Sequence, residues 1–223
     1  MSATPDNHDK PVMPTVYLVD DEDAVRDALA FLLRSRGLEV QAFASGRELI
    51  EALEVGADKK SNAMLASTKL RGCFLLDIRM EPMSGTALHD QFIERGLHNP
   101  VLFLTGHGDV PLAVAALKKG AFDFLQKPYS DNELVDRIEQ ALLVDAASCQ
   151  QDAKAGERSA RLASLTERER EVMQRVAAGK MNKIIADELC VSLRTIEVHR
   201  ARVFAKPKVR SAAEVATLLS ETP

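Results

Sequence analysis

The stretch YLVDDEDAV, residues 17–25, runs from an apolar segment straight into four consecutive acidic residues at positions 20–23. The run Val16–Val19 predicts a buried strand, because β-branched and aromatic residues favour strands. Two interpretations account for the acids that follow it. They either begin a helix and favour its positive end, or they hold a cation at the end of the strand.

The same alternation of strand and helix recurs through the first 144 residues. Strands are predicted at Thr15–Val19, Leu38–Phe43, Cys73–Leu76, Val101–Leu104 and Ala121–Leu125. Helices are predicted at Asp23–Arg36, Arg47–Val55, Gly85–Arg95, Val110–Lys118 and Asp131–Val144. Five strand–helix units predict a parallel sheet with helices on both faces. The long polar stretch Gly56–Gly72 fits this plan poorly, and we expect it to be an insertion.

Length and composition indicate an ordinary globular protein. The chain has 223 residues, of which 46% are apolar and 28% charged, which is enough for two domains with buried cores. No stretch approaches the roughly 20 apolar residues of a membrane span, so no membrane contact is expected. The polar N-terminus lacks the pattern of a signal peptide, and we expect a cytoplasmic protein. The three cysteines have no paired spacing, which argues against a disulfide framework or a zinc site.

Charge is distributed unevenly along the chain. Residues 161–223 carry 12 Lys and Arg against 8 Asp and Glu, whereas the whole chain has a net charge of −4. A basic C-terminal part on an acidic chain suggests that this part alone meets an anionic polymer. We expect a flexible tail at 1–13, an α/β domain at 14–144, a linker at 145–163 and an all-helical domain at 164–223.

Polar residues stand at the ends of four predicted strands. Asp20 and Asp21 end the first, Asp77 the third, Thr105 the fourth and Lys127 the fifth. In a doubly wound sheet, ligands bind beyond the carboxyl ends of the strands. Carboxylates that converge there repel each other unless a cation joins them, and Mg²⁺ prefers such oxygen ligands. The set therefore predicts a Mg²⁺ site, with Lys127 placed to neutralise an anion.

The motifs LVDDED, LLDIRM, MSG, LTGHGDV and AFDFLQKP resemble the receiver domain of two-component response regulators. The resemblance covers about residues 14–140, and it implies a flavodoxin-like sheet with the strand order 2-1-3-4-5. It implies that a histidine kinase phosphorylates Asp77. It also implies that Asp20, Asp21, Asp77 and the backbone carbonyl of Arg79 hold Mg²⁺.

The same resemblance implies a conformational switch. Thr105 and Lys127 would contact the phosphoryl group, and Phe124 would swing inward. Alternation along the strand also permits Phe124 to be a plain core aromatic. The implied change remodels the face formed by the fourth helix, fifth strand and fifth helix. One departure from the family pattern is Glu81, which takes the usual place of proline, with Pro82 after it; its carboxylate either affects the pocket or points to solvent.

The C-terminal part contains two short helical patterns separated by a tight turn, with Ser192 as N-cap of the second. This arrangement predicts a helix-turn-helix, although a small protein-interaction domain would show similar helices. The stretches LTERERE, GKMNKIIADEL and VSLRTIEVHR resemble the LuxR-type helix-turn-helix over about residues 162–220. That resemblance implies four helices, the third being a recognition helix from Ser192 to about Ala205, before Pro207.

The recognition helix and its surroundings supply the candidate DNA contacts. We expect base-edge contacts from Arg194, Glu197, Val198 and Arg202. We expect phosphate contacts from Lys180, Asn182, Thr195, His199 and Arg200. His199 has a second interpretation as a side chain packed between helices.

Together the two parts resemble a FixJ-type response regulator. The resemblance implies a transcription regulator whose phosphorylation drives homodimerisation through the face of the fourth helix, fifth strand and fifth helix. Its implied partners are a sensor histidine kinase, double-stranded promoter DNA and RNA polymerase. It is not expected to be an enzyme, beyond slow hydrolysis of its own aspartyl phosphate.

Three alternatives stay open at this point. In one, the receiver controls DNA binding without phosphorylation. In another, the chain is an aspartyl-nucleophile phosphohydrolase, although Arg79 stands where that chemistry usually places a second acid. In the third, the protein is an adaptor whose helical domain binds proteins rather than DNA.

Overall fold

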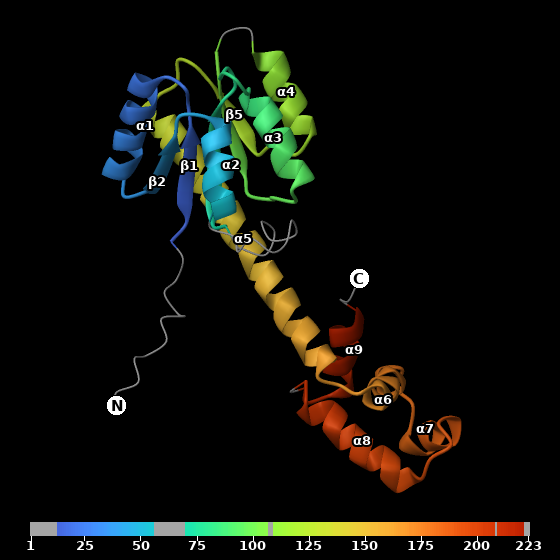
Figure 1. Ribbon diagram of the computed structural model, residues 1–223. Coiled ribbons are helices and arrows are strands. Elements are labelled where there is room, and N and C mark those ends of the chain that lie inside the picture. The colour runs from blue at the N-terminus through green and yellow to red at the C-terminus, as the bar shows by residue number, and fades with distance from the viewer. Residues whose placement is uncertain (1–12, 56–69, 107–108, 208, 221–223) are drawn as a thin grey trace, which may run out of the picture. The chain divides into compact units, whose positions relative to one another are not determined.

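The computed structural model describes residues 13–55, 70–106, 109–207 and 209–220, which form two compact units dividing between Ser148 and Cys149. The N-terminal unit alternates strands and helices as predicted (Figure 1). Its strands are β1 (Thr15–Val19), β2 (Glu39–Phe43), β3 (Gly72–Asp77), β4 (Val101–Thr105) and β5 (Asp123–Gln126). Its helices are α1 (Asp23–Ser35), α2 (Gly46–Val55), α3 (Gly85–Glu94), α4 (Val110–Lys118) and the first part of α5 (Asp131–Ala163), which continues past the division. The predicted insertion lies mostly outside the described residues, which resume at Leu70.

The five strands form one parallel sheet in the order β2-β1-β3-β4-β5, which confirms the predicted order. The central strands β3 and β4 are buried at every position, which explains their uninterrupted apolar sequences. Side chains alternate between the two faces of the sheet. Phe74 and Leu76 of β3 pack in the core beneath α2, α3 and α4, whereas Cys73 and Leu75 pack in the core beneath α1 and α5.

The register of the sheet brings the ends of four strands together. Val19 pairs with Leu76, so the next residues along these two strands, Asp20 and Asp77, lie side by side. Thr105 ends β4 and pairs with Gln126, which precedes Lys127. The predicted polar residues therefore gather at one edge of the sheet because all five strands run in the same direction.

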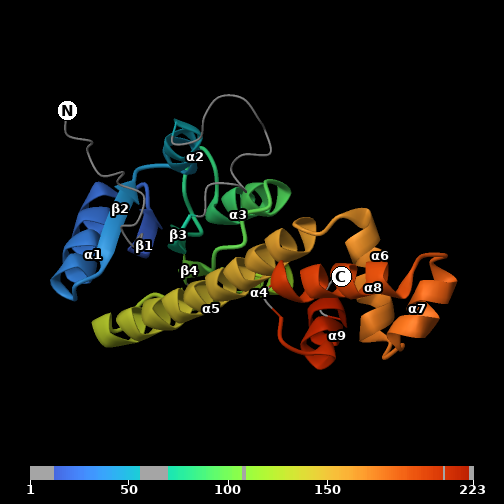
Figure 2. The same cartoon turned by 90° about the horizontal axis from the view of Figure 1, so that it is seen from below.

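Helix α5 is much longer than predicted. The sequence predicted its end at Val144 and a linker over residues 145–163, but Figure 2 shows one uninterrupted helix through Ala163. The segment lacks apolar periodicity because its residues are exposed on nearly every side. It is nevertheless rich in Ala, Gln, Lys, Arg and Glu, all of which have high helix propensity. Helix propensity decided the structure here, and hydrophobic patterning gave no signal.

The C-terminal unit is all-helical over its described residues, as predicted. It consists of α6 (Glu167–Ala177), α7 (Asn182–Glu188), α8 (Leu193–Ala205) and α9 (Ala212–Ser220). Val172 and Met173 of α6, Ile185 of α7 and Val203 of α8 are fully buried in one core. Thr166 and Glu169 form a capping box at the start of α6.

Gly72 makes the close approach of β1 and β3 possible. Its φ is +124°, and a Cβ atom there would lie 1.8 Å from the backbone oxygen of Thr15. Gly72→Ala is therefore expected to destabilise the N-terminal unit by at least about 2 kcal/mol, because backbone strain and steric overlap add. Urea unfolding followed by far-ultraviolet circular dichroism measures the change.

Gly156→Ala is the matched control, since a Cβ atom at Gly156 meets nothing within 4 Å. It lies within helix α5, so alanine is expected to be neutral or to stabilise by about 0.5–1 kcal/mol. Equal stability of the two variants would show that β1 and β3 do not require glycine at position 72.

Candidate functional site

An acidic pocket lies at the carboxyl edge of the sheet and consists of Asp20, Asp77, Thr105 and Lys127. Lys127 connects its two carboxylates. Its Nζ lies 2.6 Å from Asp77 Oδ1 and 4.0 Å from Asp20 Oδ2. Burial alone would lower the pKa of Lys127, but its hydrogen bond with Asp77 and the nearby carboxylate charges outweigh burial and raise the pKa. The ammonium is thus held in its charged form beside Asp77.

Asp77 is oriented by two donors. Its Oδ1 accepts a hydrogen bond from Lys127 Nζ, and its Oδ2 accepts one from the backbone N–H of Arg79 at 2.7 Å. The carboxyl is largely buried, with 8% of the residue exposed. A carboxylate fixed by charged and backbone donors is oriented for attack on an electrophile.

Asp20 is the most buried acid of the pocket, at 1% exposure. Its Oδ1 accepts the Glu22 N–H at 2.9 Å, whereas its Oδ2 is buried with no hydrogen-bond partner among the described residues. Burial raises the pKa of Asp20, and the charges of Asp77 and Asp21 add to the effect. A buried carboxylate oxygen without a partner, facing a second carboxylate, suits a hard cation with oxygen ligands.

The structure does not gather the full predicted metal-binding set. Asp21 is exposed, and its Oδ2 accepts the backbone N–H of Glu81 at 3.1 Å. Within the described residues, no three Asp, Glu, His or Cys side chains are grouped closely enough to hold a metal ion. Of the described residues, Asp20 and Asp77 alone offer carboxylate oxygens suited to Mg²⁺ at this edge, and Asp21 would have to leave the Glu81 N–H to join them.

Thr105 and Phe124 are placed differently from each other. Thr105 is fully buried, and its Oγ1 has no hydrogen-bond partner in the described part of the chain. Phe124 is only half-buried on β5 and packs against the core beneath α2, α3 and α4. A buried hydroxyl without a partner costs free energy, so Thr105 gains from any acceptor placed in the pocket.

An ion pair that the sequence did not predict lies beside the pocket. Arg79 Nε donates to both carboxylate oxygens of Asp109, at 2.8 and 2.9 Å, and Arg79 Nη2 lies 2.7 Å from Oδ1. The Asp109 side chain is 2% exposed, and its hydrogen bonds with Arg79 lower its pKa. Both residues stand in quoted motifs, but 30 positions separate them, so only the fold could reveal the contact.

The departure at Glu81 proves to be a surface feature. Glu81 is exposed, which agrees with the solvent-facing interpretation, and its backbone N–H binds Asp21. The Glu81–Pro82 and Lys127–Pro128 peptide bonds are both cis.

In the C-terminal unit, α7 and α8 form the predicted helix-turn-helix. The turn passes through Cys190, whose φ is +52°. Ser192 caps α8 by accepting the N–H of Thr195 at 3.1 Å, and α8 ends at Ala205, before Pro207, as predicted. The four predicted base-contacting residues are exposed on α8: Arg194, Glu197, Val198 and Arg202.

The predicted phosphate-contacting residues are more constrained. Arg200 donates to Asn182 Oδ1 at 2.8 Å and lies over the ring of Phe204 at 5.5 Å. The hydroxyl of Thr195 contacts that of Ser192 at 2.7 Å. His199 is half-buried, and its Nδ1 has no hydrogen-bond partner among the described residues, which favours packing between helices.

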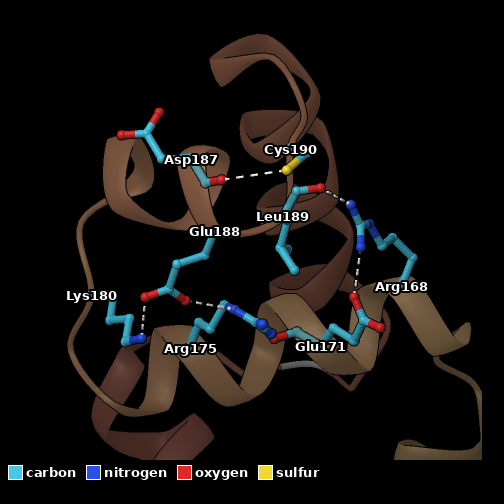
Figure 3. Close-up of polar contacts among 8 residues, drawn as sticks. All are labelled: Arg168, Glu171, Arg175, Lys180, Asp187, Glu188, Leu189 and Cys190. Carbon is cyan, nitrogen blue, oxygen red and sulfur yellow. Dashed lines mark hydrogen bonds and ion pairs between the residues drawn. The ribbon is translucent and has the colours of Figure 1, made fainter.

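Lys180 belongs to an ion-pair network between α6 and α7 (Figure 3). The Glu188 carboxylate forms ion pairs with Lys180 and with Arg175, whose Nε lies 2.9 Å away. Arg168 donates to the backbone oxygen of Leu189 at 2.6 Å and to Glu171 at 2.7 Å. These contacts join α6 to both α7 and the turn before α8, so part of the basic charge of this unit supports its own structure.

A further ion pair, Glu169–Lys206, lies at the end of α8. Glu169 is 1% exposed, and its Oε2 receives Lys206 at 2.6 Å and the Thr166 N–H at 2.9 Å. The hydrogen bond with Lys206 is the main reason that the pKa of Glu169 falls to about 2. The pair connects the start of α6 to the residue that follows α8.

Each of the two units matches a known protein family. Residues 16–139 match the family of response regulator receiver domains, and residues 163–219 match the bacterial regulatory proteins of the luxR family. None of the helices in the described residues is long and apolar enough to span a membrane.

Similar proteins extend over nearly the whole chain. The chain is 44% identical to the C4-dicarboxylate transport transcriptional regulatory protein DctR of Rhodobacter capsulatus, over 92% of this chain and 98% of that protein. It is 41% identical to the transcriptional regulatory protein FixJ of Azorhizobium caulinodans, over 90% and 89% of the two chains.

Solved structures give the same result. The response regulator StyR matches with a TM-score of 0.83 and 37% identity, over 95% of this chain and all of that one. Full-length FixJ from B. japonicum matches with a TM-score of 0.55 and 40% identity, over 93% and 96%.

The Glu169–Lys206 pair predicts a pH-dependent stability of the C-terminal unit. Because the pKa of Glu169 is lowered to about 2 from 4.5, its contribution is complete above about pH 5 and is lost as the pH falls toward 2. Glu169→Gln should cost roughly 1.5–3 kcal/mol at pH 7, the usual value of a hydrogen bond to a charged group. The difference between wild type and variant should shrink as the pH falls to 3 in thermal melts.

Glu167→Gln is the control, since Glu167 is an exposed acid in the same first turn of α6. It should change stability far less. A pH-independent difference between wild type and Glu169→Gln would show that the Glu169 charge is not what stabilises the unit.

Proposed function

Because the chain belongs to the response regulators that join a receiver domain to a LuxR-family DNA-binding domain, we propose that phosphorylation of Asp77 controls its binding to promoter DNA. The chain is a transcription regulator, and its receiver domain implies a histidine kinase as partner. The observation that carries the proposal is the position of Asp77, which Lys127 and the Arg79 N–H hold beside the buried carboxylate of Asp20. Binding to promoter DNA requires the cytoplasm, where we place the protein.

In the proposed reaction, an oxygen of the Asp77 carboxylate attacks the phosphorus of a phosphohistidine. An O–P bond forms as the N–P bond breaks. The electron pair of the broken N–P bond stays on the ring nitrogen of the histidine. Lys127 stabilises negative charge on the transferring oxygens. The acyl phosphate is later hydrolysed when water attacks phosphorus, which restores the carboxylate and releases inorganic phosphate. No external metabolite is turned over.

Receiver domains generally bind Mg²⁺ at the phosphorylation site. We assign its protein ligands here as the carboxylates of Asp20, Asp21 and Asp77 and the backbone carbonyl of Arg79. When bound, Mg²⁺ would neutralise the converging carboxylates and the phosphoryl oxygens. The raised pKa of Asp20 supports this assignment, as does its Oδ2, which accepts no hydrogen bond from the described residues.

The switch is proposed to start at Thr105. Its unpartnered hydroxyl would move to the phosphoryl group, and Phe124, which is only half-buried, would turn into the space released. The change would remodel the face of α4, β5 and α5, through which two copies associate. Leu112 and Val114 of α4 support such an interface, because they are 49% and 39% exposed.

Dimerisation would let two helix-turn-helix units bind paired half-sites, so affinity rises through effective concentration. We assign base contacts to the exposed Arg194, Glu197, Val198 and Arg202. Phosphate contacts are assigned to the remaining candidates: Lys180, Asn182, Thr195, His199 and Arg200. RNA polymerase is the proposed further partner at the promoter.

Light scattering tests the phosphorylation switch. Wild-type protein is expected to change from monomer to dimer when Mg²⁺ and beryllofluoride, a mimic of the aspartyl phosphate, are added together. Asp77→Asn should stay monomeric under the same conditions, because it lacks the carboxylate that completes the site. A dimer of the variant, or a wild-type protein that never dimerises, would favour control of DNA binding without phosphorylation.

Fluorescence anisotropy tests the DNA interface. With a duplex selected from a random-sequence pool by the activated protein, Arg194→Ala is expected to weaken binding by roughly 1–3 kcal/mol. Arg170→Ala removes an exposed arginine of α6 and should change binding little. Wild-type affinity should also fall steeply with salt. Binding that ignores salt would instead support the adaptor alternative.

A further inference from the structure

The Arg79–Asp109 ion pair joins two residues that follow the strand ends of the pocket, Arg79 after β3 and Asp109 after β4. Arg79 lies two residues after Asp77, and its own N–H already contacts the Asp77 carboxylate. Asp109 lies four residues after Thr105, at the N-cap of α4. The pair therefore spans from the phosphorylation site to the start of a helix in the proposed dimer face.

The Asp109 carboxylate is used unusually for its position. Aspartate at an N-cap normally accepts N–H groups of its own helix. Asp109 makes no such side-chain bond to α4, and both of its oxygens face Arg79 instead. The Asp109 side chain is 2% exposed whereas that of Arg79 is 74% exposed, so the guanidinium covers a buried carboxylate from the solvent side.

We propose that Arg79 exchanges Asp109 for the phosphoryl group when Asp77 is phosphorylated, and that this exchange transmits phosphorylation to α4. The proposal rests on the proposed phosphorylation of Asp77. A phosphoryl group carries more negative charge than one carboxylate, and arginine binds both with the same two-pronged geometry. The long side chain of Arg79 starts next to Asp77, so the new anion competes directly for the guanidinium.

The exchange has a consequence for α4. A buried carboxylate that loses its cation is strongly unfavourable. Asp109 can relieve this cost by accepting the Leu112 N–H in the first turn of α4, since Pro111 has no N–H to donate. The first turn of α4 would therefore change with the state of Asp77. The same segment connects α4 to Thr105, whose hydroxyl also needs an acceptor.

The exchange predicts opposite effects for the two members of one ion pair. Arg79→Gln should slow phosphorylation of Asp77 by acetyl phosphate roughly tenfold, less than the loss of an oxyanion-hole donor. Asp109→Asn frees Arg79 and should speed phosphorylation roughly fivefold, at the low end of typical couplings between sites. Phosphate-affinity gels give the rates of formation with Mg²⁺ and donor, and the rate of decay after the donor is removed.

Asp90→Asn is the matched control. Asp90 on α3 binds Lys119, just after α4, through both carboxylate oxygens at 2.6 and 2.8 Å. Its loss removes an ion pair at the opposite end of α4 from Asp109 without touching the pocket, so the phosphorylation rate should stay within about twofold of wild type. Thermal melts identify any variant that is unfolded.

The outcomes distinguish a failure of the proposed exchange from a failure of the proposed phosphorylation of Asp77. Arg79 and Asp109 variants that change the rate in the same direction, or not at all, would show that the pair is only structural. Wild-type protein and Asp90→Asn that both fail to accept phosphate on Asp77 would instead overturn the proposed function.

A second measurement needs no Asp109 variant. The Nε–Hε signal of Arg79 in the ¹⁵N nuclear magnetic resonance spectrum can be assigned from its absence in Arg79→Lys. Addition of Mg²⁺ and beryllofluoride to wild-type protein should shift it, because its acceptor changes from Asp109 to fluoride. An unmoved signal, in protein whose other pocket signals respond, would overturn the exchange.

Discussion

The parallel direction of five strands is the constraint on which the N-terminal unit depends. It brings Asp20 and Asp77 to the same edge, where their charges repel and where burial raises the pKa of Asp20. Lys127, which directly follows β5, contacts both carboxylates and offsets part of that repulsion. The same topology also places the Thr105 hydroxyl there without a partner among the described residues. A stable core thus forces together polar groups that are not fully satisfied by one another.

Local sequence predicted the parts of this arrangement that depend on periodicity. Strands β3 and β4 are continuous apolar runs that end in polar residues, so both the strands and the site residues Asp77 and Thr105 could be predicted. Pairings between distant segments could not. The Arg79–Asp109 pair and the engagement of Asp21 by the Glu81 N–H depend on how loops approach one another, and no spacing in the sequence encodes that.

Helix α5 shows a different limit of sequence patterns. Its C-terminal part has no buried face to produce a hydrophobic period, yet it is helical because its residues favour the helix individually. In the C-terminal unit, sequence predicted the exposed face of α8 well, since Arg194 and Arg202 lie there. It did not predict that Lys180 would pair with Glu188, because a basic residue can form an ion pair within the protein as readily as it can bind a DNA phosphate.

The Thr105 hydroxyl and the buried Asp20 Oδ2, which have no hydrogen-bond partner in the described part of the chain, bear on how this protein would respond to redesign. A procedure that optimised melting temperature alone would replace both with residues that need no partner, and the resulting protein would be more stable but would lose the proposed switch. The pocket is thus a place where thermal stability and responsiveness are opposed. Thermostable variants intended to keep signalling should draw their gains from elsewhere, such as the exposed face of α5.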